Sequence, residues 1–379
     1  HLGSWRQEGL REMNFKSFQT AIDISITEKV DFILIAGDLF DSAYPPIEIL
    51  KESFAEFKKI KEAGIPLYLV AGSHDFSASG KTFLDVMEKS GFCKNVESYD
   101  LLEDGRMKLK PSFYKDIAIY GYPGRKSGME VDDLKRITFD YVSPFTIFML
   151  HSTIKDVVGN IPMDSIEKER LPLADYYAMG HIHKRFETRL SNSVFVYPGP
   201  TYPNNFQELV DLKCGSFNLV EVNGGKIVTK NITMPLRDVA FIEIELTNGF
   251  TATQEIILEL DKHNLHDKIL LLKLKGLITQ GKTADISFNE IEEFAKKKGV
   301  FEFLRNISFL RSSEGNLVSS VVSDGDMDGI EKKIRDEYTI ANPDEFNMYL
   351  PDLMNLLSIE KNEDEKISLF EDRLVKDLK

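Results

Sequence analysis

The sequence predicts a layered α/β fold for roughly the first two-thirds of its 379 residues, and three observations support this prediction. Short apolar segments alternate along the chain with polar loops and with stretches of helical periodicity. The chain is longer than one typical domain, so it should hold two or three, at least one of them with a substantial core. Hydrophobic residues make up 42% and charged residues 28%, which is an ordinary globular balance.

Six short apolar segments are predicted to be strands: residues 30–36, 66–71, 117–121, 146–150, 176–179 and 194–197. Two further stretches place apolar side chains at helical spacing, which are Phe15, Phe18, Ile22 and Ile26 in the first and Leu50, Phe54, Phe57 and Ile60 in the second. Both stretches should form amphipathic helices. The main domain is expected to repeat a unit of strand, polar loop and helix.

The character of the sequence changes near residue 235. We expect the main domain over 1–235, a small α+β domain over 236–311, a linker rich in Ser and Asp over 312–344, and a helical segment over 345–379. That last segment holds two short amphipathic helix candidates, around 345–357 and 363–378. Short helices are marginal alone and usually dock onto something.

The net charge of −14 argues at first against a nucleic-acid partner, because phosphate binding relies on clusters of Lys and Arg. The acid is unevenly distributed, however. Segment 312–379 holds 17 Asp and Glu against 8 Lys and Arg, so it carries −9 of the total charge. The main domain therefore keeps a nucleic-acid partner open.

The cysteines and the apolar segments predict where the protein resides. Cys93 and Cys214 are isolated in sequence, and the sequence shows no secretory signal, which indicates a reduced cytoplasmic protein. The apolar segments are far short of a membrane-spanning helix. The sequence begins with His1 and not with Met, so we expect native residues to precede it.

Polar side chains follow four of the predicted strands. Five of the seven histidines stand at the start of the chain or just after a strand, and Gly-Asp-Leu-Phe-Asp at 37–41 follows the first strand. The strand ends run into Gly37-Asp38, Gly72-Ser73-His74-Asp75, His151-Ser152 and Gly180-His181-Ile182-His183. Ligands of α/β sheets bind outside the carboxyl ends of the strands, so these groups should meet at one edge.

Mixed imidazole and carboxylate ligands suit Mn²⁺, Fe²⁺ or Zn²⁺. Two such ions about 3.5–4 Å apart clamp the attacking and leaving oxygens of a phosphodiester, and Asp38 is the natural bridge between them. A single His after a strand is more often a structural residue, and the Gly-Asp turn alone could be a plain cap. The four motifs together favour a metal site. Because His181 and His183 are two residues apart, the backbone must bend there if both are to face the metals.

These motifs resemble the series of the calcineurin-like metallophosphoesterases. More narrowly, Gly37 to Asp41 with the following Tyr44-Pro45-Pro46, the segment ending at Arg185, and Tyr197-Pro198-Gly199-Pro200 look like the SbcD branch of DNA double-strand-break repair nucleases. The resemblance covers about 1–235 by motif and the remainder by layout only. It implies a layered αββα sandwich with a small α+β capping domain and a C-terminal helical tail.

The resemblance also implies residue roles. His1, Asp38 and His183 would hold one metal, and Asp38, His151 and His181 the second. Ser73 stands where the family has a metal-ligating Asn, and the family's first Asp would lie two residues before His1. His74 resembles the catalytic histidine, with Asp75 orienting it. Family members cut DNA as exonuclease and endonuclease, typically with Mn²⁺, so two divalent ions are the expected cofactors.

The partners implied are DNA, a second copy of the chain and an SbcC-like coiled-coil ABC ATPase, in the cytoplasm or at the nucleoid. The capping domain would help to bind or sort DNA. The helical segment would dock onto the ATPase through an apolar stripe, which consists of Phe346, Tyr349, Leu350, Leu353, Leu356 and Leu357. The same stripe could instead pack on this chain's own capping domain.

Two alternatives remain open from the residues. The first is a phosphatase or phosphodiesterase on the same scaffold that acts on a small nucleotide or a phosphoprotein, because the metal motifs alone do not separate these substrates from DNA. The size of the capping domain and the apolar tail favour DNA. The second is a non-catalytic scaffold relative, which Ser73 and the missing first Asp support and which the intact His74 and Asp38 disfavour.

Overall fold

A computed structural model describes residues 1–75, 77, 82–125, 129–159, 161 and 163–312. The expected helical segment over 345–379, with its stripe of apolar residues, and the linker beyond Ser312 lie outside the described residues. The main domain contains two sheets that face each other. The first has the order β1-β2-β3 and is parallel, with strands at Ile33–Ala36, Leu67–Val70 and Lys94–Asn95.

The second sheet has six strands in the order β11-β12-β10-β9-β7-β6. Its parallel centre is formed by β7 (Ile117–Tyr122), β9 (Phe145–His151), β10 (Tyr176–Gly180) and β12 (Ser193–Pro198), and its antiparallel edges by β6 (Ser112–Tyr114) and β11 (Arg185–Leu190). The predicted strands are confirmed with shifts of up to three residues at their ends. A small sheet joins β4 (Tyr99–Leu101), β5 (Met107–Leu109) and β8 (Ile137–Thr138).

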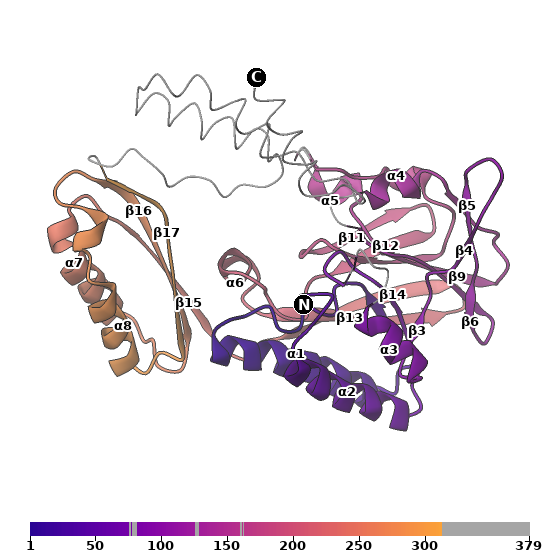
Figure 1. Cartoon of the computed structure of the whole chain (residues 1–379), viewed down its shortest axis with the longest axis horizontal. Coiled ribbons are helices and arrows are strands. Elements are labelled where there is room, and N and C mark those ends of the chain that lie inside the picture. The colour runs from indigo at the N-terminus through magenta and orange to yellow at the C-terminus, as the bar shows by residue number, and fades with distance from the viewer. Residues whose placement is uncertain (76, 78–81, 126–128, 160, 162, 313–379) are drawn as a thin grey trace, which may run out of the picture. The chain divides into compact units, whose positions relative to one another are not determined.

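Strand side chains alternate between two cores, which establishes the layers. In β2, Leu67 and Leu69 pack with the helices α1 (Glu8–Thr27), α2 (Ile47–Glu62) and α3 (Phe83–Lys89), whereas Tyr68 and Val70 face the second sheet. Figure 1 shows α1 and α2 side by side in indigo. The two predicted amphipathic helices are α1 and α2.

The opposite face of the second sheet has its own cover. Phe148 and Leu150 of β9 pack there with residues of β5, of β8 and of the short helix α4 (Glu130–Leu134), and partly buried Val157 of α5 (Lys155–Val158) packs against this core. The order of layers is therefore helices, sheet, sheet and a mixed layer, which confirms the αββα expectation. The expected repeat of one helix per strand is wrong in this half. The small sheet takes the place of long helices because it covers the same apolar face.

The chain continues past β12 through α6 (Phe206–Leu212) into a long hairpin of β13 (Gly215–Asn223) and β14 (Lys226–Met234). It then forms a three-stranded sheet of β15 (Val239–Glu245), β16 (Ile269–Ile278) and β17 (Glu302–Ser312), with α7 (Gly249–Asp261) and α8 (Phe288–Lys297) between successive strands in sequence.

The described residues divide into two compact units. One unit comprises 1–242, 259–273 and 289–305, and the other comprises 243–258, 274–288 and 306–312. The second unit contains the end of β15, most of α7 and the pairing of Asn248 with Gln280. The sequence-based boundary near residue 235 stays a prediction.

Candidate metal centre

The carboxyl ends of strands from both sheets meet at one edge. His151 ends β9 and lies in register with Gly180 at the end of β10. Asp38 follows β1, and the His74 loop follows β2. The His151 Nδ1 lies 2.8 Å from the carbonyl oxygen of Ala36, so a hydrogen bond joins the two sheets at this edge. The placement that the strand ends predicted is confirmed.

His1 reaches the same edge through backbone pairing. Leu2 and Phe40 form a parallel bridge, in which the Leu2 amide donates to the Leu39 carbonyl at 2.9 Å and the Asp41 amide donates to the Leu2 carbonyl at 3.2 Å. The amino group of His1 donates to the Asp38 carbonyl at 2.7 Å. His1 is therefore held beside Asp38 by main-chain hydrogen bonds.

Two groups of donor atoms share the Asp38 carboxylate. One group consists of His1, Asp38 and His183, and the other of Asp38, His151 and His181. The Asp38 Oδ2 lies 3.2 Å from Nε2 of both His1 and His151. The His1 and His183 Nε2 atoms are 3.1 Å apart, and the His181 Nδ1 is 3.3 Å from the His151 Nε2.

These spacings fit divalent metal ions. Ligands about 2.1 Å from an ion, at angles of about 90–110° to one another, lie about 3.0–3.4 Å apart. The four distances above fall in that range. The donor set is nitrogen and carboxylate oxygen, which suits first-row divalent metals. The residues present therefore fit a pair of ions that share Asp38.

Three of the imidazoles are oriented through their other ring nitrogen. Acceptors for Nδ1 are the Asp41 carboxylate at 3.4 Å for His1, the Ala36 carbonyl at 2.8 Å for His151 and the Glu208 carboxylate at 2.9 Å for His183. An acceptor at Nδ1 keeps the proton there and leaves the Nε2 lone pair free for a metal. All three Nε2 atoms are the ones that point into the Asp38 groups.

The backbone is unusual at two of these residues. Asp38 and His181 have φ values of +52° and +84°, in the left-handed region that non-glycine residues rarely adopt. The bend that the spacing of His181 and His183 required is therefore present. The adjacent loop approaches closely as well, because a Cβ on Gly72 would lie 2.1 Å from the Asp38 Oδ1.

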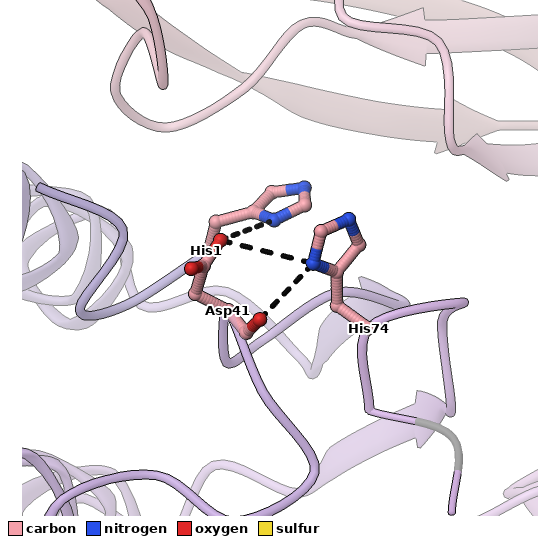
Figure 2. Close-up of side chains that lie close together, drawn as sticks. All are labelled: His1, Asp41 and His74. Carbon is pink, nitrogen blue, oxygen red and sulfur yellow. Dashed lines mark hydrogen bonds and ion pairs between the residues drawn. The ribbon is translucent and has the colours of Figure 1, made fainter.

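His74 stands at the rim of the centre beside Asp41. Figure 2 shows the His1 and His74 rings near each other, each with its Nδ1 turned toward Asp41. The His74 Nδ1 is 3.0 Å from the Asp41 carbonyl oxygen and 3.7 Å from its carboxylate. Whereas the His151 side chain is 1% exposed, that of His74 is 47% exposed, so it can meet a substrate.

Asp75 lies beneath the loops. It is 1% exposed, and its carboxylate accepts hydrogen bonds from the backbone amides of Leu39, Phe40 and Gly72 at 3.0–3.2 Å. These bonds tie the loop after β1 to the loop after β2. Asp41, not Asp75, is the acidic residue beside the His74 ring.

Burial and charge shift the pKa values in the metal-free centre. Burial would lower the pKa of His1, but hydrogen bonds and charges from Asp38 and Asp41 outweigh it and raise the pKa to about 9. Burial likewise opposes the rise in the pKa of His151 that Asp38 causes. For His181, burial and the nearby His151 lower the pKa to about 4.

The two buried carboxylates of the centre differ. Burial would raise the pKa of Asp38, but hydrogen bonds and charge from His1 and His151 hold it far below its usual range. Burial raises the pKa of Asp75, although the amides of Gly72 and Phe40 oppose this rise. Asp38 is therefore an anion whose charge is compensated by the imidazoles of His1 and His151. A metal ion that binds there would displace protons from these imidazoles.

Two residues of the centre were absent from the set of sites that the sequence predicted. Asp41 is the last residue of the motif at 37–41. The presence of a second Asp in that motif is the signal that could have identified Asp41 as a site residue. Glu208 lies in α6, 25 positions after His183, and no motif in the sequence indicated it. Ser73 is half-buried in the loop before His74, and its role as a ligand stays a prediction.

Two arginines near the motifs, Arg125 and Arg185, make contacts within the domain. The Arg125 guanidinium contacts the Asp133 carboxylate at 3.0 Å and the Tyr122 hydroxyl at 3.2 Å. Arg185 donates to the Ser216 hydroxyl at 3.0 Å and to the Cys214 carbonyl at 2.9 Å. Both guanidinium groups are therefore engaged by other residues of the domain.

The layers and the donor groups define an α/β protein with a candidate dinuclear metal centre at the carboxyl edge of its sheets. Residues 1–185 match the family model described as calcineurin-like phosphoesterase. These residues are a calcineurin-like metallophosphoesterase domain. The match confirms the resemblance to this family that the sequence motifs indicated. Residues 1–185 are thus similar to metallophosphoesterase hydrolases, a family that uses divalent metals.

Relatives named for DNA repair are among the similar proteins. "DNA double-strand break repair protein Mre11" of Methanocaldococcus jannaschii is 32% identical over 243 residues, which are 61% of this chain and 63% of that protein. The protein of the same name from Methanosarcina mazei is 25% identical over 317 residues, which are 79% of this chain and 47% of that protein.

A relative without an assigned substrate also matches. "Uncharacterized metallophosphoesterase YhaO" of Bacillus subtilis is 30% identical over 224 residues, which are 58% of this chain and 52% of that protein. The chain thus spans about half the length of the first curated relatives that it matches. Across the described residues, none of the helices has the length and apolar character that a membrane span requires.

Proposed function

We propose that the chain is a two-metal DNA nuclease that hydrolyses phosphodiester bonds, as exonuclease and endonuclease, in double-strand-break repair. The observation that carries this proposal is the Asp38 carboxylate shared by two groups of imidazole donors. Relatives named as break-repair proteins support DNA as the substrate. The proposed cofactors are two Mn²⁺ ions, since imidazole and carboxylate donors suit that metal.

His1, Asp38 and His183 would hold one ion, and Asp38, His151 and His181 the other, with Ser73 beside the second. Such ions polarise the phosphoryl oxygens and lower the pKa of water, so that hydroxide is available near neutral pH. The chain's own contribution is to fix the donors. Main-chain pairing holds His1, and the acceptors at Nδ1 hold three of the rings.

His74 is the proposed catalytic residue, because it is the exposed imidazole of the centre. Hydrolysis breaks the bond between phosphorus and one ester oxygen, and that oxygen takes up a proton as it leaves. A protonated His74 would supply that proton and stabilise the negative charge of the transition state. Asp41 orients the ring through Nδ1, and Asp75 supports it indirectly by fixing the two loops.

The wider assembly is proposed from the sequence. The residues over 236–311 would cap the nuclease domain and help to bind DNA. The segment over 345–379 would dock onto an SbcC-like ABC ATPase, and two copies of the chain would pair as a homodimer. A cytoplasmic or nucleoid location follows from these partners. The alternative is a phosphodiesterase on a small nucleotide or a phosphoprotein, which the YhaO relative leaves open.

The test compares two substrates under matched conditions. The purified chain is incubated with linear double-stranded DNA and with a small phosphodiester, in Mn²⁺ or in EDTA, beside Asp38→Ala and His74→Ser variants. Calorimetry establishes whether each protein binds Mn²⁺. We expect Mn²⁺-dependent DNA cutting that both variants lose, with metal binding retained in His74→Ser.

Each other outcome selects an alternative. Turnover of the small ester without DNA cutting would replace the nuclease with a small-substrate phosphodiesterase. Inactivity on both substrates despite Mn²⁺ binding would favour a non-catalytic scaffold. Absence of Mn²⁺ binding in the wild-type chain would contradict the metal centre itself.

A further inference from the structure

Glu208 contacts a proposed metal ligand from outside the motif series. Its Oε1 lies 2.9 Å from the His183 Nδ1, while the His183 Nε2 lies 3.1 Å from the His1 Nε2. The two ring nitrogens of His183 therefore have separate partners. His183 is the more exposed of the two histidines in this donor group. Its side chain is 26% exposed, whereas that of His1 is 8% exposed. His183 thus depends more on a hydrogen bond for its orientation than on packing.

Glu208 is itself fixed from several directions. Its Oε2 accepts from the Asn204 amide at 2.8 Å, and its Oε1 accepts from the Asn205 side-chain amide at 2.7 Å. Its own amide donates to the Asn205 Oδ1 at 2.9 Å, which caps α6. The Glu208 side chain is 18% exposed. Because the Glu208 carboxylate is fixed in this way, it can hold the His183 ring in one orientation.

The loop that holds Glu208 also holds the chain next to His1. The Ser4 hydroxyl donates to the Asn204 Oδ1 at 3.3 Å, and the Trp5 indole donates to the Pro203 carbonyl at 2.8 Å. Leu209 packs in the same apolar core as Trp5. His1 and His183 are 182 positions apart in sequence, yet one short loop braces the surroundings of both.

A helix cap alone does not account for these contacts. Asp85 supplies a comparison, because its carboxylate accepts from the Thr82 amide at 2.8 Å and completes the cap of α3. In α6 the Asn205 side chain caps the helix, and the Oε2 of Glu208 accepts from the Asn204 amide, one residue before that cap. Its Oε1 contacts the His183 Nδ1 as well as the Asn205 side-chain amide.

We propose that Glu208 is a positioning residue for the metal centre, which orients His183 so that its Nε2 faces the ion it shares with His1 and Asp38. This inference rests on the proposed metal centre. Loss of an acceptor that orients a metal-binding histidine typically weakens metal binding by about 10- to 100-fold. The effect should be confined to one of the two ions, because Asp38, His151 and His181 do not depend on Glu208.

The experiment measures Mn²⁺ binding by calorimetry for the full chain and for Glu208→Ala, Glu208→Gln and Asp85→Ala. We expect two ions in the wild type, one of them bound about 10- to 100-fold more weakly in Glu208→Ala. Glu208→Gln retains an oxygen acceptor for His183, so it should recover part of the loss. Asp85→Ala should keep both affinities, although it loses a comparable cap.

A second measurement begins with the wild-type chain. The chain has seven histidines, so nitrogen-15 spectra of the metal-free wild type can resolve their ring protonation. The His183 ring should carry its proton on Nδ1. In Glu208→Ala the same ring should become a mixture of the forms protonated on Nδ1 and on Nε2. A wild-type His183 protonated only on Nε2 would overturn the role of Glu208.

The outcomes separate this inference from the function on which it rests. A wild type that fails to bind two Mn²⁺ ions contradicts the metal centre. A wild type that binds both, with Glu208→Ala affinities within about twofold of it, leaves the centre standing and overturns the positioning role. Equal losses in Glu208→Ala and Asp85→Ala would do the same, since both would then report helix stability alone.

Discussion

Replacing Gly72 with Ala should abolish tight metal binding while the fold remains. The added Cβ would lie 2.1 Å from the Asp38 Oδ1 and 2.2 Å from the Asp38 amide nitrogen. Ordinary van der Waals contact begins near 3.4 Å. Gly72 has no positive φ, so the substitution adds no backbone strain, and the overlap alone determines its effect.

The size of the overlap sets the expected magnitude. To remove this overlap, either Asp38 or the Gly72 loop must move by about 1 Å. Metal sites tolerate changes of only about 0.2 Å in their ligand distances. A misplacement of about 1 Å at a reacting centre costs on the order of 100-fold. Overpacking typically destabilises a fold by about 1–3 kcal/mol. We therefore expect Mn²⁺ affinity to fall at least about 100-fold with a modest loss of stability.

Gly121→Ala provides the matched control. Its Cβ would lie 2.4 Å from a Val96 methyl and 2.6 Å from a Val70 methyl, in the core between the sheets. It should lower the unfolding midpoint in urea but leave Mn²⁺ binding by the folded protein unchanged. Calorimetry and urea unfolding of both variants make the comparison. Mn²⁺ affinity of Gly72→Ala within about twofold of the wild type would refute the reasoning.

Three further outcomes are expected. His74→Ser should lower kcat on DNA by about 10²- to 10⁴-fold with Mn²⁺ binding retained, and loss of binding in calorimetry would assign His74 to the metal instead. Asp41→Asn should lower kcat and weaken binding of one ion, because Asp41 contacts both His1 and His74; wild-type kinetics would contradict this. The pKa of His1 in the metal-free chain is raised from 6.5 to about 9, so its stabilising contribution is complete below pH 6.5 and lost as pH rises through 9. Urea unfolding should show a decrease of at most about 3 kcal/mol over that range, and a flat profile would contradict the ion pair.

The sequence was informative where the chain is buried on both sides. Segments such as 146–150 and 176–179 are short and apolar because they lie between two cores, and this pattern identifies strands without any homologue. The polar groups that follow them had to meet, since parallel strands end at one edge. Asp38, His151 and His181 come together for this reason.

The sequence was uninformative where contacts depend on tertiary packing. The hairpin of β13 and β14 alternates weakly, with several exposed positions on both strands, so its pattern did not stand out. The acceptor role of Glu208 depends on a cap that brings α6 to His183. No spacing rule connects residues that far apart in sequence, and only the folded arrangement makes the contact visible.

The close approach of the two sheets also positions the centre. A Cβ on Gly180 would lie 1.8 Å from the Ala36 carbonyl oxygen, which is also the acceptor for the His151 Nδ1. Because Gly180 has no side chain, β10 can approach β1. The hydrogen bond from His151 to the Ala36 carbonyl then holds His151 beside Asp38. The loops after β1 and β10 turn at Asp38 and His181, which both have positive φ. Backbone strain at these residues is therefore offset by the packing of the sheets, which holds both loops in place.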